Sequence, residues 1–204
     1  MRSSFILLVG MLLSAPAFAD DSGLVAPKNQ KLVSVEYTSN GRQTGCGLRA
    51  TGDTEDGLSL NVLITVFGKE TGATFGVVKV VARQMQMKDG IPQMQDGNIV
   101  YADLGKIDHA WVTTESGKRP FVYKDGEVSH ADAYMVNTEF ASTLDFMAAM
   151  LQERFNVGLN RKPDGPDQVF RFNVYLPPGE GSRFSTCIGN LRTELDGQRR
   201  QENF

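Results

Sequence analysis

The sequence is poor in cysteine and histidine and has no large excess of either charge. Its 204 residues include two Cys, two His and one Trp, and 21 Lys and Arg stand against 24 Asp and Glu, a net charge of −3. So few Cys and His rule out most zinc sites, which take four such ligands. Without a basic excess, nucleic-acid binding is disfavoured. With 41% hydrophobic and 22% charged residues, the composition fits one ordinary globular domain.

Long apolar runs are absent except near the N-terminus. One arginine precedes the apolar segment 5–13, and an Ala-Phe-Ala motif ends at Ala19. The apolar segment is shorter than the roughly 20 residues that span a bilayer. We therefore predict a signal peptide over 1–19, cleaved between Ala19 and Asp20. The mature protein would be periplasmic, or otherwise secreted, without a membrane anchor.

Cys46 and Cys187 are the two cysteines. Thiols of exported proteins are oxidised outside the cytoplasm, so an even pair predicts a disulfide. The alternative is a catalytic thiol assisted by His109 or His130, which would leave the second cysteine unpaired.

After the signal peptide the chain alternates between apolar and polar residues. Residues 20–30 form a polar lead without periodicity, which we expect to be flexible. Beyond it, apolar residues recur at every second position, most clearly at 58–67, and six Asp-Gly pairs provide sites for tight hairpin turns. We place strands near 33–37, 44–51, 58–67, 75–81, 99–103, 107–114, 120–123 and 169–176.

The C-terminal part has a helical period instead. Apolar residues between Phe140 and Phe155 recur at steps of three and four, which predicts a helix over 138–157 that ends at Gly158. A second stripe predicts a helix over 182–197 with Cys187 on its apolar face.

These patterns together predict an α+β fold. We expect an antiparallel sheet of about six to eight strands with two amphipathic helices in the C-terminal half, in a single domain over 31–204. We see no internal repeat.

Both histidines have a carboxylate nearby. His130 and Asp132 share a face if their segment is extended, so His130 could be the general base of a small hydrolase. Asp108 directly precedes His109, but neighbours on a strand point to opposite faces, so we do not expect Asp108 to orient His109. A Gly-x-Ser-x-Gly nucleophile motif is absent.

Three methionines lie close together in the sequence. Met85, Met87 and Met94 carry thioethers, which are soft ligands suited to Cu(I). The M-x-M spacing would put the first two on one face of a strand. The alternative is that all three are apolar side chains of a strand and a hairpin.

The leading functional hypothesis is an exported, non-enzymatic protein that binds another protein or an envelope component, with no cofactor. The alternatives are the hydrolase with His130 and Asp132, and a copper-handling protein with the three methionines. Histidines that meet in space would favour the hydrolase, and clustered methionines would favour copper. A large exposed apolar patch, particularly around Trp111, would favour protein binding.

Overall fold

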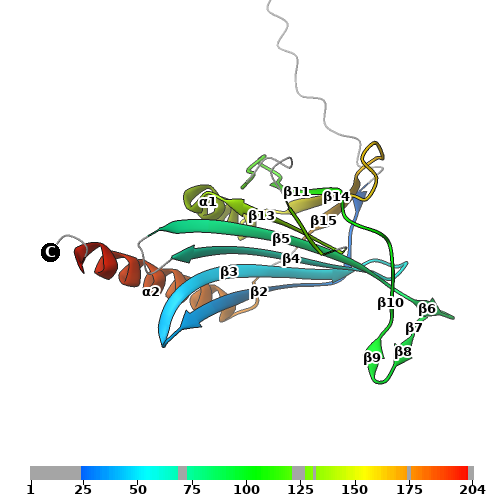
Figure 1. Cartoon of the computed structure of the whole chain (residues 1–204), viewed down its shortest axis with the longest axis horizontal. Helices are drawn as coiled ribbons and strands as arrows, with labels where there is room; N and C mark the ends of the chain where they lie inside the picture. The colour runs from blue at the N-terminus through cyan, green and yellow to red at the C-terminus, as the bar shows by residue number, and fades with distance from the viewer. Residues whose placement is uncertain (1–23, 69–72, 121–126, 131, 174–175, 202–204) are drawn as a thin grey trace, which may run out of the picture.

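The computed structural model describes residues 24–68, 73–120, 127–130, 132–173 and 176–201 (Figure 1). The predicted signal peptide and its cleavage site at Ala19 and Asp20 lie outside this part, so they remain predictions. The same holds for most of the strand expected at 120–123.

The main sheet is a meander of long strands. Its order is β12-β13-β5-β4-β3-β2, all antiparallel, and β10 pairs with the end of β5. The strands are β2 (Lys28–Ser39), β3 (Arg42–Asp53), β4 (Leu58–Gly68), β5 (Thr74–Met85), β10 (Tyr101–Ala102), β12 (Glu127–His130) and β13 (Ala133–Thr138).

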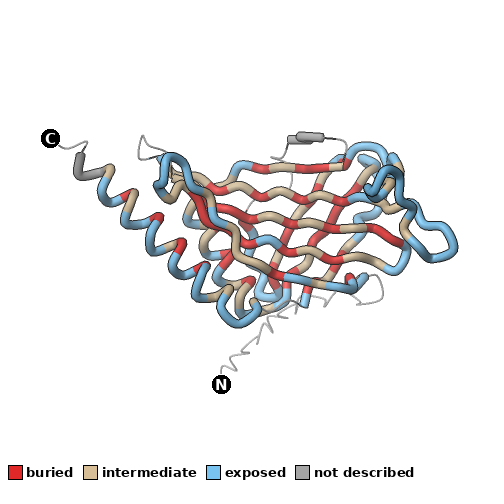
Figure 2. Tube along the Cα trace, turned by 90° about the horizontal axis from the view of Figure 1, so that it is seen from below, coloured by how far each residue is buried: buried red, intermediate tan, exposed pale blue. Residues whose placement is uncertain are grey.

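Strict alternation in the sequence gives this sheet one core face. Leu60, Val62 and Ile64 of β4 are fully buried, whereas Leu63 and Val77 on the opposite face are half-buried. Figure 2 shows this alternation along the strands. The turn between β2 and β3 is Asn40-Gly41, and both residues have positive φ, 51° and 75°, as a tight hairpin turn requires.

A second sheet has the order β1-β15-β14-β11. Its strands are β1 (Leu24–Val25), β11 (His109–Thr114), β14 (Phe155–Asn160) and β15 (Gln168–Phe172). β1 runs parallel to β15, and the other pairs are antiparallel. Phe155 and Phe172 stack with ring centroids 5.0 Å apart. The segment 20–30, which was expected to be a flexible lead, contains β1 and the start of β2 in its described part.

Two helices complete the fold. α1 (Phe140–Met150) contacts β4, β5 and β11, and α2 (Glu180–Gln201) contacts β2 and β3. α2 starts before and ends after the predicted range 182–197, and its apolar face is buried as expected. Among the described residues, no helix has the length and apolar character needed to cross a membrane.

The helix predicted over 138–157 is wrong in its second half. α1 ends at Met150, and Phe155 and Gly158 belong to β14. The polar residues 152–154 separate the helix from a segment in which Phe155, Val157 and Leu159 are all buried. This two-residue period favours a strand. Phe155 also fits the helical spacing of the preceding apolar residues, which is why the helix was predicted to continue.

The predicted pairing of Cys46 and Cys187 is confirmed. Their sulfurs are 2.02 Å apart, and the bond joins β3 to α2 across a sequence separation of 141 residues. Both side chains are buried. The catalytic-thiol alternative is therefore wrong, since neither cysteine is free.

The α+β class is confirmed, but the expectation of one sheet is not. The strands form a seven-stranded sheet, a four-stranded sheet and two separate two-stranded hairpins. The strand predicted at 99–103 is split between one of these hairpins and β10.

Candidate interaction site

An arm, residues 86–104, consists of two short hairpins that project from the end of the main sheet and of the segment through β10 by which the chain returns to that sheet (Figure 1). β6 (Met87–Lys88) pairs with β7 (Ile91–Pro92), and β8 (Met94–Gln95) pairs with β9 (Asn98–Ile99). Asp-Gly pairs make both turns, with φ of 53° and 78° at 89–90 and of 52° and 79° at 96–97. Two consecutive positive φ values are the signature of a tight hairpin turn.

Backbone hydrogen bonds close the base of the arm into a ring. Gln86 N–H donates to the Val100 carbonyl at 2.9 Å, Gln93 N–H to Gln86 at 2.7 Å, and Val100 N–H to Gln93 at 2.9 Å. Each residue thus binds the other two, and both hairpins start from the same three-way junction. The arm therefore holds a defined shape, although its strands are only two residues long.

The arm carries most of the large apolar side chains that are exposed among the described residues. Among the described residues, six of the seven large apolar side chains that are exposed belong to it, and the seventh is Val25. The six are Met87, Ile91, Met94, Ile99, Tyr101 and Leu104, with Ile91 at 68% and Met94 at 59% exposure. Exposed apolar residues are usually scattered singly over a protein surface, so their concentration on one projecting element makes the arm the candidate interaction site.

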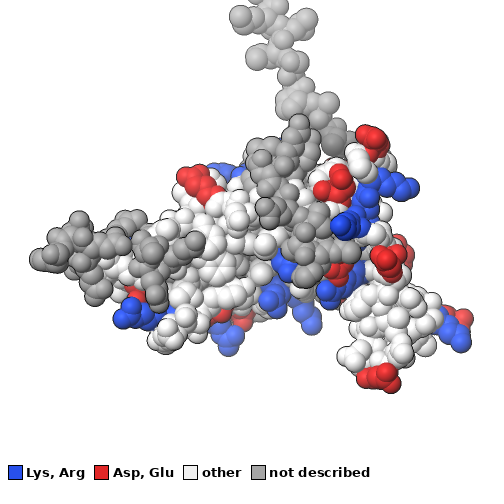
Figure 3. Space-filling view, in the orientation of Figure 1, with Lys and Arg blue, Asp and Glu red and all other residues white. Residues whose placement is uncertain are grey.

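Charged residues border this apolar surface. Asp89 and Asp96 occupy the two turns, and Lys88 precedes the first of them. In Figure 3 the arm is mostly uncharged, with charged groups at its margins. An apolar centre with a polar rim is the usual arrangement of protein–protein contact surfaces.

A short repeat in the sequence encodes the arm. Gln-Met-x-Asp-Gly occurs at 86–90 and again at 93–97, and each copy builds one junction residue, one strand and one turn. The expectation that the chain contains no internal repeat is therefore wrong at this scale. The two copies are seven residues apart. Repeats that build whole structural units have periods of about 20–50 residues, so a search for such repeats does not find this one.

The proposed copper ligands lie on three different strands. Met85 ends β5, Met87 starts β6 and Met94 starts β8, so the strand break at Gln86 removes the expected common face of the M-x-M pair. A Cβ added to Gly57 would lie 3.2 Å from the Met87 sulfur, which places that thioether beside the backbone of the β3–β4 turn. Copper binding stays an untested hypothesis.

His109 sits between two carboxylates, away from the arm. Its Nδ1 lies 3.0 Å from Asp108 Oδ2 and its Nε2 lies 2.9 Å from Asp167 Oδ1. Burial acts to lower the pKa of His109, but the hydrogen bonds and charges of the two carboxylates outweigh it and raise the pKa. The expectation that Asp108 does not orient His109 is wrong, because Asp108 precedes the first residue of β11 and is free of the strand's alternation.

Asp167 accepts hydrogen bonds from several neighbouring side chains. Its Oδ2 accepts the Trp111 indole N–H at 2.6 Å, and its Oδ1 also accepts from the Asn160 amide at 3.2 Å. Burial acts to raise the pKa of Asp167, but these hydrogen bonds and that of His109 lower it overall. Trp111 is half-buried, so it anchors the 160–167 loop to β11 and does not form an exposed patch.

His130 and Asp132, the candidate residues of the hydrolase hypothesis, are not part of the group around His109. Asp132 lies between β12 and β13 and forms an ion pair with Arg83 of β5. His130 ends β12, on a different sheet from His109, and its side chain lies outside the described part. Within the described ranges, no three Cys, His, Asp or Glu side chains are grouped as a metal site would need.

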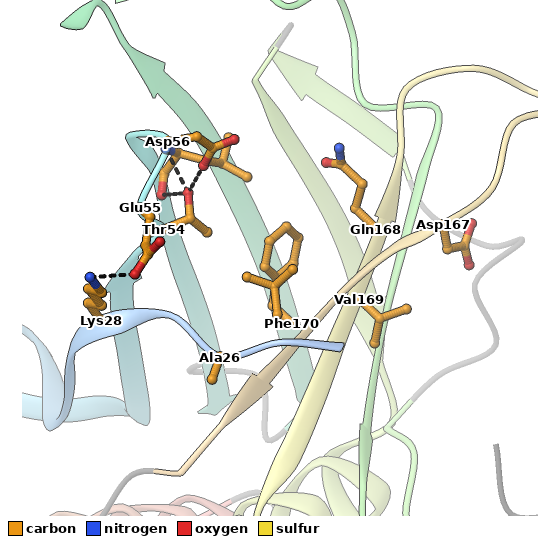
Figure 4. Close-up of a pocket in the computed structure, with 11 residues that line it drawn as sticks. Ala26, Lys28, Thr54, Glu55, Asp56, Asp167, Gln168, Val169 and Phe170 are labelled. Atoms are coloured by element: carbon orange, nitrogen blue, oxygen red, sulfur yellow. Dashed lines mark hydrogen bonds and ion pairs between the residues drawn. The ribbon is translucent and has the colours of Figure 1, made fainter. Parts of the chain in front are cut away.

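A cavity of about 510 Å³ lies between β1, β15 and the β3–β4 turn (Figure 4). Its polar side is formed by Lys28, Thr54, Glu55 and Asp56, and Phe170 lies opposite. Lys28 Nζ is 2.6 Å from Glu55 Oε1, and this hydrogen bond and charge lower the pKa of Glu55. The polar groups on this side thus bind one another, and the cavity shows no arrangement that defines a chemistry.

Comparison with protein-family models, curated protein sequences and solved structures gives no match for this chain.

Proposed function

We propose that this is an exported, periplasmic binding protein that docks another envelope protein through the arm. The observation that carries the proposal is the concentration of exposed apolar side chains between Met87 and Leu104. Exposed Met, Ile and Tyr are costly in water and are typical of contact surfaces. The predicted signal peptide and the disulfide support an oxidising compartment outside the cytoplasm.

A protein partner suits the arm better than a lipid surface. Each hairpin has a carboxylate at its turn, Asp89 in the first and Asp96 in the second. Burying such a charge in the bilayer is costly, and an anionic surface would repel it. At the rim of a protein contact the same carboxylates stay hydrated.

The test is affinity capture from the native envelope with the mature, disulfide-bonded protein as bait. Ile91→Asp combined with Met94→Asp places two charges on the most exposed apolar positions of the arm. Loss of a specific partner with this variant is the expected result. Val25→Asp is the matched control, because Val25 is 44% exposed and lies on β1.

The proposal is overturned if the double variant retains every partner that the unchanged protein captures. It is also overturned if Val25→Asp abolishes capture to the same extent. Circular dichroism of all three proteins checks that the fold is intact, which the exposure of the substituted positions predicts.

A further inference from the structure

A second apolar feature is a groove between the two helices, which no other described residue fills. Its volume is about 430 Å³, within the range of sites that enclose a ligand. Phe140 and Leu144 of α1 line one side, and Ile188, Leu191 and Leu195 of α2 line the other. Phe140, Leu144 and Ile188 are only partly buried, so the groove is open to solvent.

The groove and the arm lie at opposite ends of the molecule. Figure 1, whose horizontal direction is the longest axis, shows the arm (β6 to β9) at one end and α2 with the C-terminus towards the other. The arm of one copy therefore cannot reach its own groove. A contact between these two features has to join two molecules.

The groove and the arm each carry charges of both signs, because Arg192 and Asp196 both line the groove and the arm carries Lys88, Asp89 and Asp96. Arg192, at the edge of the groove, has 84% of its side chain exposed, and its Nε is 3.8 Å from Asp196 Oδ2. That separation is at the limit for an ion pair, and such exposed pairs contribute little. Arg192 can therefore accept a second carboxylate as a partner. Lys88 and Asp89 are adjacent in the arm, so an arm beside this groove would bring a cation for Asp196 as well as a carboxylate for Arg192.

We infer that the arm of one copy inserts its apolar side chains into the groove of a second copy, so that the chains associate head to tail. This rests on the proposed function, because it identifies the partner of the same arm as another copy of this chain. A contact between two different surfaces leaves one arm and one groove free in every pair. It therefore continues until the rotation between copies closes a ring, or else it forms an open chain.

Sedimentation velocity of the purified, disulfide-bonded protein tests the inference. The weight-average mass should rise from that of the monomer as the concentration increases. Ile91→Asp removes the most exposed apolar side chain of the arm and should weaken association tenfold or more. Arg192→Glu reverses the charge at the groove on an exposed side chain, so it should weaken association without disturbing the fold.

Mixing variants distinguishes head-to-tail contact from other modes. Ile188→Glu blocks the groove more severely than Arg192→Glu, and its thermal unfolding is compared with that of the unchanged protein because Ile188 is partly buried. Ile91→Asp and Ile188→Glu each lack one half of the contact. Their mixture should give one-to-one dimers and nothing larger, because only one arm and one groove remain intact.

Two outcomes overturn the inference: a monomer at every concentration, or association that persists in both the arm and the groove variants. Val25→Asp should associate like the unchanged protein. If the protein is monomeric but its arm still captures a different envelope protein, the proposed function stands and only the self-association fails. If the arm variant associates normally and also retains its captured partners, both fail.

Discussion

Replacing Gly158 by Ala should displace the indole ring of Trp111. Gly158 of β14 is the register partner of Trp111 of β11, and the indole covers it. A Cβ added to Gly158 would overlap the indole atoms Cε2, Cζ2 and Nε1. Backbone pairing fixes both strands, so the indole itself has to move.

The size of the effect follows from two contributions. Forcing an extra carbon into a packed site costs about 1–3 kcal/mol. Displacing the indole also breaks its 2.6 Å hydrogen bond to Asp167, and hydrogen bonds to charged groups contribute about 1.5–3 kcal/mol. The two costs are not fully additive, because one movement of the indole causes both. We therefore expect the free energy of unfolding to fall by about 2–4 kcal/mol.

Chemical denaturation with the disulfide intact measures this change, and fluorescence reports where the indole goes. The chain has one Trp, so the emission spectrum belongs to Trp111 alone and should shift to longer wavelength. Gly189→Ala is the control, because nothing lies within 4 Å of the added Cβ on α2. It should raise stability by about 0.5–1 kcal/mol, as Ala replaces Gly in a helix. A loss below about 0.5 kcal/mol for Gly158→Ala, with unchanged emission, would refute the reasoning.

Two further predictions concern His109 and the disulfide. The folded state raises the pKa of His109, so its stabilisation is complete below the ordinary pKa and is lost as pH rises through the folded pKa. As the pH rises from the ordinary histidine pKa of about 6.5 through the raised pKa of the folded state, the unchanged protein should lose stability relative to His109→Gln. A stability difference between the two proteins that stays the same at every pH would contradict this. Replacing Cys46 and Cys187 by Ala opens a loop with a sequence separation of 141. The free energy of unfolding should fall by up to about 5 kcal/mol, whereas a loss below about 1 kcal/mol would show that the loop entropy is not the main contribution.

Local periodicity was sufficient to predict the elements that bury one face. Leu60, Val62 and Ile64 alternate without interruption, and their strand begins at Leu58 as predicted and ends one residue later than predicted, at Gly68. Phe184, Cys187 and Leu191 likewise share one buried helical face. In both cases one surface is hidden, so the period of the apolar residues equals the period of the backbone.

Prediction failed where two periods overlap or where partners are distant. Phe155 fits both the stripe of α1 and the alternation of β14, and in the folded chain it begins β14 and stacks on Phe172 of the neighbouring strand. Sequence alone also could not pair Asp167 with His109, 58 residues earlier. The apolar residues of the arm were missed as a site because a sequence reveals that residues are apolar, not that they remain exposed.

The disulfide between β3 and α2 has a consequence for how the chain matures. If the chain is exported N-terminus first, Cys46 reaches the oxidising compartment while the 141 positions up to its partner are still to follow. Two cysteines permit only one intramolecular pairing, so this chain needs an oxidant but no isomerase to reach its native bond. Until Cys187 arrives, the Cys46 thiol can be trapped by another protein's thiol, and that interval is the step at which maturation is most open to error.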